Sequence, residues 1–368
     1  MKVFPWSICL FAVGLLVGAL HAEDPVLSTP GTATWMTDMT STGTRTVFTL
    51  TKNTVLNWAQ LDVKSGSELV FNFEGGKSVV NFLGGSGVHV IDGTVTSNGI
   101  VAFFSPTADL EVNGSIIAKG VTLSTLNTDS TEFFQEKGYR MSGLDGLNFL
   151  TVNGHVEAVG GDVVIGGERV IIGDTAKIRA SKDVLIGGGA DISVAGSGER
   201  RLKDNSGVGY VLHLGETGAS RIEVVAGMEV SNQGRLDAGK GRIFLEVGSD
   251  GLITNESSGV IVGNAVFTGA YDANGVVVVP DEGDSIPVVS EGLMTIPELR
   301  RPDGSAVNGE QRTLTNSVPM SASEDAGRKA LRGDQPDKRL AQRSGAKSML
   351  QRSSFFGMRG GNAAPAKR

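Results

Sequence analysis

The chain has 368 residues, including 52 glycines, 11 prolines and a single cysteine. The glycine at every third position that collagen requires is absent, and one cysteine cannot build a disulfide framework. Residues 301–368 contain 13 Lys and Arg against 6 Asp and Glu, so residues 1–300 hold 20 against 34. An acidic body of this kind argues against nucleic acid as its partner.

The first 22 residues have the pattern of a secretory signal peptide. Lys2 precedes a mostly apolar run over 8–20, which ends close to the small residue Ala22. This run is shorter than the roughly 20 residues of a membrane-spanning helix, so we predict a signal peptide over 1–22. The mature chain is then exported, to the outer cell surface or beyond, and lacks Cys9. The alternatives are a retained membrane anchor, a buried first helix or lipid attachment at Cys9.

Residues 23–46 are predicted to form an N-terminal cap or lead-in, and residues 47–300 a single β domain. From about 47 to 279, short runs rich in Val, Ile and Leu alternate with Gly, Asn and Asp, which predicts short strands and tight turns. Over 129–137 we expect a loop or one helical turn. Short strands fit a sandwich, a barrel or a solenoid, so an internal repeat must decide among them.

Three segments repeat one template: a glycine, an apolar residue two positions later and an alanine four positions later, before a second apolar run. They begin at Gly114, Gly154 and Gly234, and an earlier copy begins at Gly93. The separations of 40 and 80 residues are two and four multiples of about 20, and 175–186 is a further copy. A period of about 20 residues suits one coil of a parallel β-helix. An evenly spaced antiparallel sandwich is the alternative.

In such a helix the four template glycines should lie at the corners of successive coils, where we expect Gly and Asn to adopt positive φ. Alternation within strands predicts which side chains face the interior. Ile178 and Ile186 should point inward. Lys177, Arg179 and Asp183 should face water.

The β pattern stops near residue 301, and the remaining 301–368 are predicted to be a disordered basic tail. Gly, Ser, Arg, Lys, Gln and Asp dominate this segment, which has too few apolar residues to offset the entropy of ordering. Transient helices are expected over 326–332 and 340–352. The basic charge suits anionic lipid, an acidic glycan or the acidic body of the same protein, and a solubilising role is equally consistent.

The chain offers little for catalysis or metal binding. Beyond residue 22 its histidines are His89, His155 and His213, each in a strand-like run and outside any metalloprotease motif. Residues 75–78 resemble a phosphate loop but lack its first glycine, and 272–275 are expected to form a turn rather than a calcium loop. We therefore predict no cofactor, no metal and no enzymatic activity.

A β-helix lyase or glycosidase acting on acidic polysaccharide is the enzyme alternative. Such chemistry needs two or three carboxylates that converge on one face of adjacent coils. Asp162, Asp174 and Asp183 show no such grouping in the sequence, and we expect them at turns or outward positions. With only 3 Trp and 3 Tyr, the chain also has few aromatic rings to stack on sugars.

Residues 55–126 carry several motifs in a fixed order. They are Leu56-Asn57-Trp58, a Gly66 to Asn72 segment containing Phe71, Ser97-Asn98-Gly99, Ser105-Pro106, and Ser124-Thr125-Leu126. This order resembles the N-terminal domain of filamentous haemagglutinins and related exoproteins of two-partner secretion. The Asn-Pro-Asn-Gly turn of that family is here Ser105-Pro106-Thr107-Ala108.

The resemblance implies a right-handed, single-stranded parallel β-helix that is exported through an outer-membrane β-barrel transporter with periplasmic modules. It further implies an adhesin or surface-structure role, with host or neighbouring-cell glycans or proteins as partners. The transporter-recognition or fold-motif positions carried over are Asn57, Trp58, Ser97, Asn98, Gly99, Ser105 and Pro106. An anchored structural repeat protein unrelated to any transporter is the remaining alternative.

Overall fold

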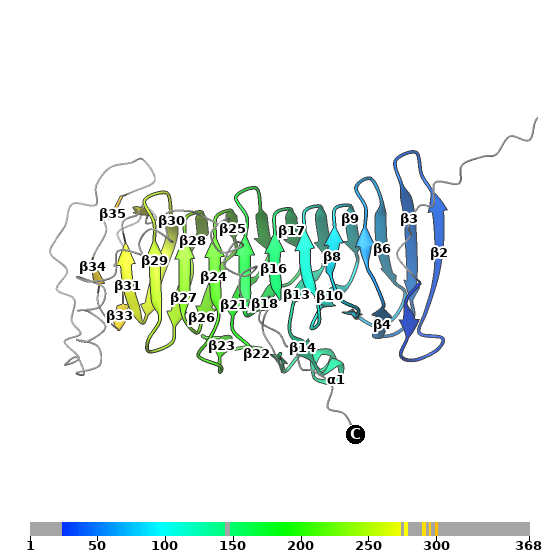
Figure 1. Ribbon diagram of the computed structural model, residues 1–368, viewed down its shortest axis with the longest axis horizontal. Helices are drawn as coiled ribbons and strands as arrows, with labels where there is room; N and C mark the ends of the chain where they lie inside the picture. The colour runs from blue at the N-terminus through cyan, green and yellow to red at the C-terminus, as the bar shows by residue number, and fades with distance from the viewer. Residues whose placement is uncertain are drawn as a thin grey trace, which may run out of the picture.

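The computed structural model describes residues 24–143 and 148–273, together with the backbone of short strands between 276 and 300. The predicted signal peptide with Cys9 and the predicted basic tail with its two transient helices lie outside the described residues. Within these residues the protein is a parallel β-helix of about ten turns, as the sequence predicts (Figure 1). The one helix among the described residues, α1 (Ser130–Phe134), lies within 129–137, where the sequence predicts a loop or one helical turn. No described helix is long and apolar enough to cross a membrane.

Each regular coil contributes one strand to each of three faces. The first face contains β4 (Thr54–Trp58), β7 (Ser78–Leu83), β10 (Ile100–Phe104), β13 (Gly120–Ser124), β18 (Val163–Gly167), β21 (Asp183–Gly188), β26 (Arg221–Ala226), the second parts of β28 (Arg235–Val247) and β30 (Val260–Thr268), and β33 (Val289–Glu291). The second face contains β3 (Thr44–Leu50), β6 (Glu68–Phe73), β9 (Thr94–Ser97), β12 (Ser115–Ala118), β17 (His155–Ala158), β20 (Lys177–Ala180), β25 (Glu216–Gly218), the first parts of β28 and β30, β32 (Val276–Val278) and β35 (Leu299–Arg300). The third face contains β5 (Asp62–Val63), β8 (Val88–Ile91), β11 (Asp109–Val112), β16 (Phe149–Val152), β19 (Arg169–Ile172), β24 (Tyr210–His213), β27 (Glu229–Asn232), β29 (Leu252–Asn255), β31 (Ala270–Ala273) and β34 (Met294–Thr295).

Residues of one kind stack in columns along the interior. On the first face the parallel register aligns, in order, Val79, Val101, Val121, Val163, Val184, Ile222, Ile243 and Ala265, all of which are buried. β-Branched side chains suit this pleated surface, and burying each one stabilises the fold by about 1.5–3 kcal/mol. The predicted inward orientation of Ile178 and Ile186 is correct.

An antiparallel pair closes the N-terminal end of the solenoid. β2 (Ala33–Met39) pairs antiparallel with β3, and β1 (Val26–Leu27) pairs antiparallel with β4. The Trp35 ring stacks on Phe48, and Phe48 stacks on Phe71 of the next coil, each at 5.4 Å between centroids. These rings cover the first coil, whose interior would otherwise face water.

The four template glycines lie at the corner between the third and second faces, but the reason for glycine differs from the one expected. None of them has positive φ, and Glu136 is the only described residue other than glycine that does. A Cβ on Gly114 would lie 2.0 Å from the carbonyl oxygen of Gly93, and one on Gly154 would lie 1.9 Å from that of Gly114. The corner therefore needs glycine because successive backbones approach too closely for any side chain.

The repeat spacing also has a different meaning from the one predicted. Gly114 and Gly154 are 40 residues apart, yet β12 pairs directly with β17, so they are one coil apart rather than two. Similarly, three coils rather than four separate Gly154 from Gly234, along β17, β20, β25 and β28. The additional residues leave the solenoid after β13 and after β21 and build a separate layer.

We expect Gly114→Ala to destabilise the protein by about 1–3 kcal/mol or more, because the added methyl group collides with a rigid backbone oxygen. Gly160→Ala is the matched control, since the nearest atom to a Cβ there belongs to the flexible side chain of Lys119, at 3.1 Å. The free energy of unfolding in urea measures both changes. Equal stability of the two variants would contradict the close-approach explanation.

Candidate functional site

The motif residues of 55–126 come together in the first coils but divide into two groups. β4, β7 and β10 are neighbours, so Asn57 aligns with Phe82 and Phe104, directly before Ser105. Ser97 instead aligns with Phe71 on the second face. Asn57 and Trp58 thus lie on the first face with the Ser105 turn, whereas Asn98 and Gly99 form the corner that leads into β10.

Trp58 and Asn57 hold the first coils together from opposite sides of one strand. Trp58 is buried and its indole Nε1 donates to Asn81 Oδ1 at 3.0 Å, while Asn81 Nδ2 donates to the Ala102 carbonyl at 3.0 Å. Asn57 Nδ2 donates to the Val26 carbonyl and to Ser28 Oγ, which attaches β1 to the solenoid. Trp58 therefore joins two neighbouring coils, and Asn57 joins the first coil to the N-terminal strand β1.

Asn98, at the corner between β9 and β10, makes backbone-like hydrogen bonds to the preceding coil. Its Oδ1 accepts from the Phe73 backbone N–H at 2.7 Å, and its Nδ2 donates to the Phe73 carbonyl. Ser97 Oγ accepts from the Gly99 N–H, and a Cβ on Gly99 would lie 2.5 Å from the Phe73 ring. The Ser97-Asn98-Gly99 motif thus forms a tight corner in which Asn98 imitates a backbone pairing partner.

The Ser105-Pro106 turn closes without a glycine. Ser105 is buried and its Oγ donates to the Ala108 carbonyl at 2.7 Å. Thr107 Oγ1 donates to the Gly85 carbonyl, and Asn148 Nδ2 donates to the Pro106 carbonyl. Neighbouring coils on both sides therefore hold this turn.

A side layer, which we did not predict from the sequence, covers the middle of the first face (Figure 1). It consists of α1 with β14 (Asn127–Thr128), β15 (Gly138–Ser142), β22 (Asp191–Ala195) and β23 (Leu202–Asp204), paired antiparallel in that strand order. Met141, Ile192 and Phe133 pack onto the outward side chains of the first face to form a second apolar core. β10, β13, β18 and β21 are accordingly buried on both sides.

Glycines in the covered strands make room for this layer. A Cβ on Gly166 would lie 2.6 Å from the Met141 Cε, and one on Gly187 would lie 2.8 Å from the Ile192 Cδ1. Continuous apolar runs without alternation, such as Ile100–Phe104, are the sequence signal for strands buried on both faces. This sequence contains such runs, but a run of this kind does not identify the segment that covers the outward side of the strand.

Charged residues that are distant in the sequence converge where the insertion between β22 and β23 meets the solenoid. Arg201 Nη1 donates to Asp162 at 2.8 Å and to Asp183 at 2.7 Å, and Arg221 also pairs with Asp183. Asp183 is buried, so its predicted exposure to water is wrong. The expectation that Asp162 and Asp183 are not grouped is also wrong, because residues of the later insertion bridge them.

Glu223 completes this charged cluster, which we define as Asp162, Asp183, Glu223, Glu246, Arg200, Arg201 and Arg221. Glu223 is fully buried, and its carboxylate accepts from the backbone N–H groups of Arg201 and Leu202 at 2.9–3.1 Å. Arg200 pairs with Glu246 and lies over the Phe244 ring at 4.7 Å. Burial alone would lower the pKa of Arg201, but its bonds to Asp183 and Asp162 outweigh burial and raise that pKa.

The charged cluster suits attachment better than catalysis. Asp162 and Asp183 both bind one guanidinium nitrogen, so neither is free to act as a general acid or a nucleophile. Within the described residues there is no group of three or more His, Cys, Asp or Glu suited to a metal ion. The arrangement instead fixes residues 200–204 to coils that are far apart in sequence.

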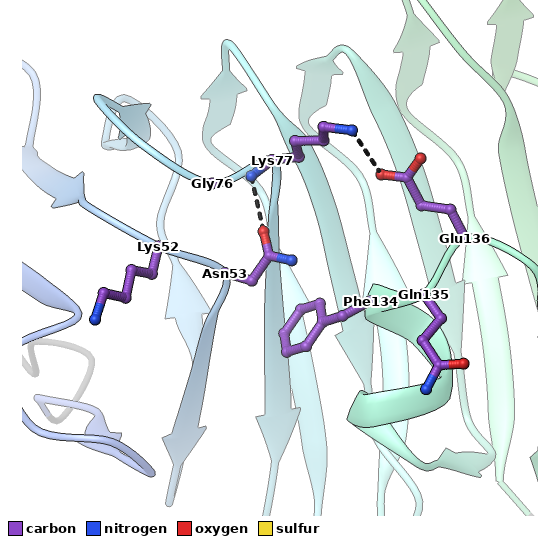
Figure 2. A pocket seen from close by; sticks show the side chains of 7 residues that line it. All are labelled: Lys52, Asn53, Gly76, Lys77, Phe134, Gln135 and Glu136. Atoms are coloured by element: carbon purple, nitrogen blue, oxygen red, sulfur yellow. Dashed lines mark hydrogen bonds and ion pairs between the residues drawn. The ribbon is translucent and has the colours of Figure 1, made fainter.

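A shallow depression lies where the side layer meets the first coils (Figure 2). Its lining residues are Lys52, Asn53, Gly76, Lys77, Phe134, Gln135 and Glu136. The Lys77 Nζ lies 3.8 Å from Glu136 Oε1, and the Asn53 Oδ1 accepts from the Lys77 N–H at 2.8 Å. With one carboxylate already beside a lysine, the depression presents no catalytic pair.

The three histidines in the described part of the chain are separated in the fold. His155 is half-exposed beside Glu157, and His89 is buried on the third face. His213 is also buried, with Nδ1 2.8 Å from Asn232 Oδ1 and Nε2 2.8 Å from Thr217 Oγ1. Asn232 Nδ2 in turn donates to Asn255 Oδ1, so a polar ladder crosses three coils of the interior. Burial lowers the pKa of His213 to about 4, and the imidazole is neutral at pH 7.

Comparison with known proteins places the fold. No family model matches this chain, and no curated protein matches it. A similar solved structure is the crystal structure of the HMW1 secretion domain from Haemophilus influenzae, with a TM-score of 0.50 and 16% sequence identity. The match covers 76% of this chain and 83% of that chain. At this identity the likeness shows a shared fold, and the class that it defines is a β-solenoid.

We expect Arg201→Ala to destabilise the protein by about 3–5 kcal/mol, because the largely buried carboxylates of Asp162 and Asp183 both lose their ion pair with Arg201. Arg45→Ala is the control: its ion pair with Glu68 is exposed and should contribute at most about 1 kcal/mol. Urea unfolding measures stability, and hydrogen exchange of β22 and β23 reports detachment of the layer. A loss at Arg201 no greater than at Arg45 would refute the attachment role.

Stability should fall on acidification because of His213. The unfolded chain takes up a proton below about pH 6.5, whereas folded His213 does so only below about pH 4, so the free energy of unfolding decreases through this window. At 1.36 kcal/mol per pH unit the loss by pH 4 is about 3 kcal/mol.

His213→Gln should remove this component of the pH dependence, although it also lowers stability at neutral pH. His155→Gln, which changes a half-exposed histidine, should retain it. Urea unfolding at about pH 7 and about pH 4.5 measures both slopes. An unchanged slope in His213→Gln would show that His213 is not the group responsible.

Proposed function

We propose that this chain is an exported β-helical protein of the two-partner-secretion type, related in function to filamentous haemagglutinin-type exoproteins. Its first coils are recognised by an outer-membrane β-barrel transporter with periplasmic modules. After export the folded solenoid is extracellular or on the outer cell surface, where it serves attachment or surface structure. Its partners there are glycans or proteins of a host or neighbouring cell.

The observation that carries this proposal is the placement of the 55–126 motifs. Trp58 and Asn98 link the first coils to one another and Asn57 attaches β1 to them, in a solenoid whose fold is similar to that of the HMW1 secretion domain. A chain that folds coil upon coil from one end can release free energy stepwise as it emerges from a pore. Its residues beyond position 9 contain no cysteine, so no disulfide opposes threading.

The Ser105-Pro106-Thr107-Ala108 turn departs from the family sequence but keeps a buried, hydrogen-bonded conformation through Ser105 Oγ. This supports the view that the turn is maintained for folding of the first coils. The polysaccharide-enzyme alternative receives less support, since the converging carboxylates Asp162 and Asp183 are both bound by Arg201. The enzyme would require a free pair.

Deleting 55–126 should abolish export, because the deletion removes the first coils and every motif proposed for transporter recognition. Deleting 183–254, which has the same length, should leave export in place. Both variants are expressed with a candidate transporter, and immunoblots compare the medium with the periplasm in a protease-deficient host. Secretion of the 55–126 deletion at the level of the full chain would reject the proposal.

A further inference from the structure

β2 is the outermost labelled strand at the N-terminal end of the solenoid (Figure 1). It is seven residues long, Ala33–Met39, and among the described residues it pairs only with β3. Its other edge is therefore open in the described part of the chain. An open edge offers a row of unpaired N–H and C=O groups to another strand.

The hydrogen bonds of the β2–β3 hairpin show which backbone groups point to this open edge. The Thr40 N–H donates to the Gly43 carbonyl at 2.9 Å, and the Thr51 N–H donates to the Thr32 carbonyl at 3.0 Å. Opposite residues of an antiparallel pair alternate between hydrogen-bonded and non-hydrogen-bonded pairs, and these two bonded pairs lie at either end of the β2–β3 register. The even-numbered residues of β2 therefore bond to β3. The N–H and C=O groups of the odd-numbered residues point to the open edge, and these residues are Ala33, Trp35, Thr37 and Met39.

β2 lacks the features that usually prevent an edge strand from pairing. Natural edge strands often carry lysine, proline or a bulge. Residues 33–39 contain one charged residue, Asp38, and no proline, and their register with β3 is uninterrupted. The open edge of β2 is therefore suited to backbone pairing with another strand.

Exposed apolar side chains gather at the same end of the molecule. Met36 and Met39 are 63% and 73% exposed, and Val26 of β1, which pairs with the first coil at this end, is 69% exposed. These are the three most exposed large hydrophobic residues in the described part of the chain. The terminal unit of a solenoid usually presents a polar outer surface, so apolar exposure here favours burial against another protein surface.

The open edge of β2 is complementary to itself. When β2 pairs antiparallel with β2 of a second copy over its full length, Met36 lies opposite Met36 of that copy and Trp35 lies opposite Thr37. The odd-numbered residues then face one another, and about eight backbone hydrogen bonds can form across the two-fold axis. Asp38 lies opposite Thr34, so the one charged residue of the strand does not face its own counterpart.

The same register brings the interior ends of the two solenoids together. Trp35 and Thr37 lie on the inward side of β2, since the Trp35 ring stacks on Phe48 and the Thr37 hydroxyl is 2.9 Å from that of Thr46. Facing residues of an antiparallel pair lie on the same side of the sheet, so both interiors lie on one side of the joined sheet. The Trp35 rings of the two copies are then diagonal neighbours, which is within reach for aromatic side chains.

We propose that two copies of this chain associate end to end through β2, which pairs antiparallel with β2 of the second copy and places Met36 at the two-fold axis. The second face then continues as one sheet through both solenoids, and the exposed methionines of this end are buried. Because the contact is two-fold, it joins two chains and stops. This proposal concerns the folded solenoid alone and does not depend on how the chain is exported.

Introduced thiols test the register directly in the full chain carrying Cys9→Ser. Met36→Cys places two thiols opposite each other in a non-hydrogen-bonded pair, where Cα atoms lie about 4.5 Å apart, within the range of a disulfide. Asp38→Cys is the matched control on the same side of the same strand, because its two thiols are four residues apart along the strands, or about 14 Å.

Oxidation with copper-phenanthroline should convert Met36→Cys into a disulfide-linked dimer at least about tenfold faster than Asp38→Cys, as measured on non-reducing gels. Equal rates at the two positions, or no linked dimer at position 36, would overturn the proposed pairing.

Charge substitutions test the association without a thiol. Met36→Lys places two cations opposite each other and should weaken dimerisation about tenfold or more, and an equimolar mixture with Met36→Glu should restore it. Val159→Lys, at a 58% exposed position after β17, should leave dimerisation unchanged. Sedimentation velocity over a range of protein concentrations measures the mass, and urea unfolding establishes that each variant is folded. A full chain that is monomeric at every concentration, a mass that rises beyond two chains, or unweakened association of Met36→Lys would refute the proposal.

Discussion

Successive coils of this protein lie one strand spacing apart, about 4.8 Å, and every other feature has to satisfy that distance. The corner between the third and second faces shows the constraint most directly. Gly93, Gly114 and Gly154 stack so closely that a Cβ on either of the later two would lie within 2.0 Å of the preceding carbonyl oxygen. The same spacing aligns the buried column from Val79 to Ala265 on the first face, and the row of His213, Asn232 and Asn255 in the interior.

Stacking at a fixed distance also allows a coil to carry an insertion without losing register. The chain leaves after β13 and after β21, and in both places the next strand returns to the third face in register. The two insertions pair with each other as β15 and β22, so they form one layer instead of two loops. This layer converts part of an outward face into a second core, and the charged cluster fastens its far end.

The buried charges of this cluster illustrate how one arrangement can resemble a catalytic site and have another role. Asp162 and Asp183 come as close together as an acid-catalysed hydrolysis would require, yet Arg201 lies between them. The hydrogen bonds between these two carboxylates and the guanidinium stabilise the attachment of the insertion to the solenoid. The carboxylates belong to different coils, which only the folded solenoid brings together. The cluster therefore depends on the coils being complete.

Local patterns in the chain were enough to predict a parallel β-helix over a sandwich, with inward residues and corner glycines, because period and alternation are properties of neighbouring residues. They did not reveal that the 40-residue step from Gly114 to Gly154 is one coil plus an insertion, since two coils have the same length. They also placed Asp183 in water, because alternation identifies the outward side of a strand but not what covers it. Which outward faces are buried was decided only by long-range packing, in which Met141, Ile192 and Arg201 meet strands far away in sequence.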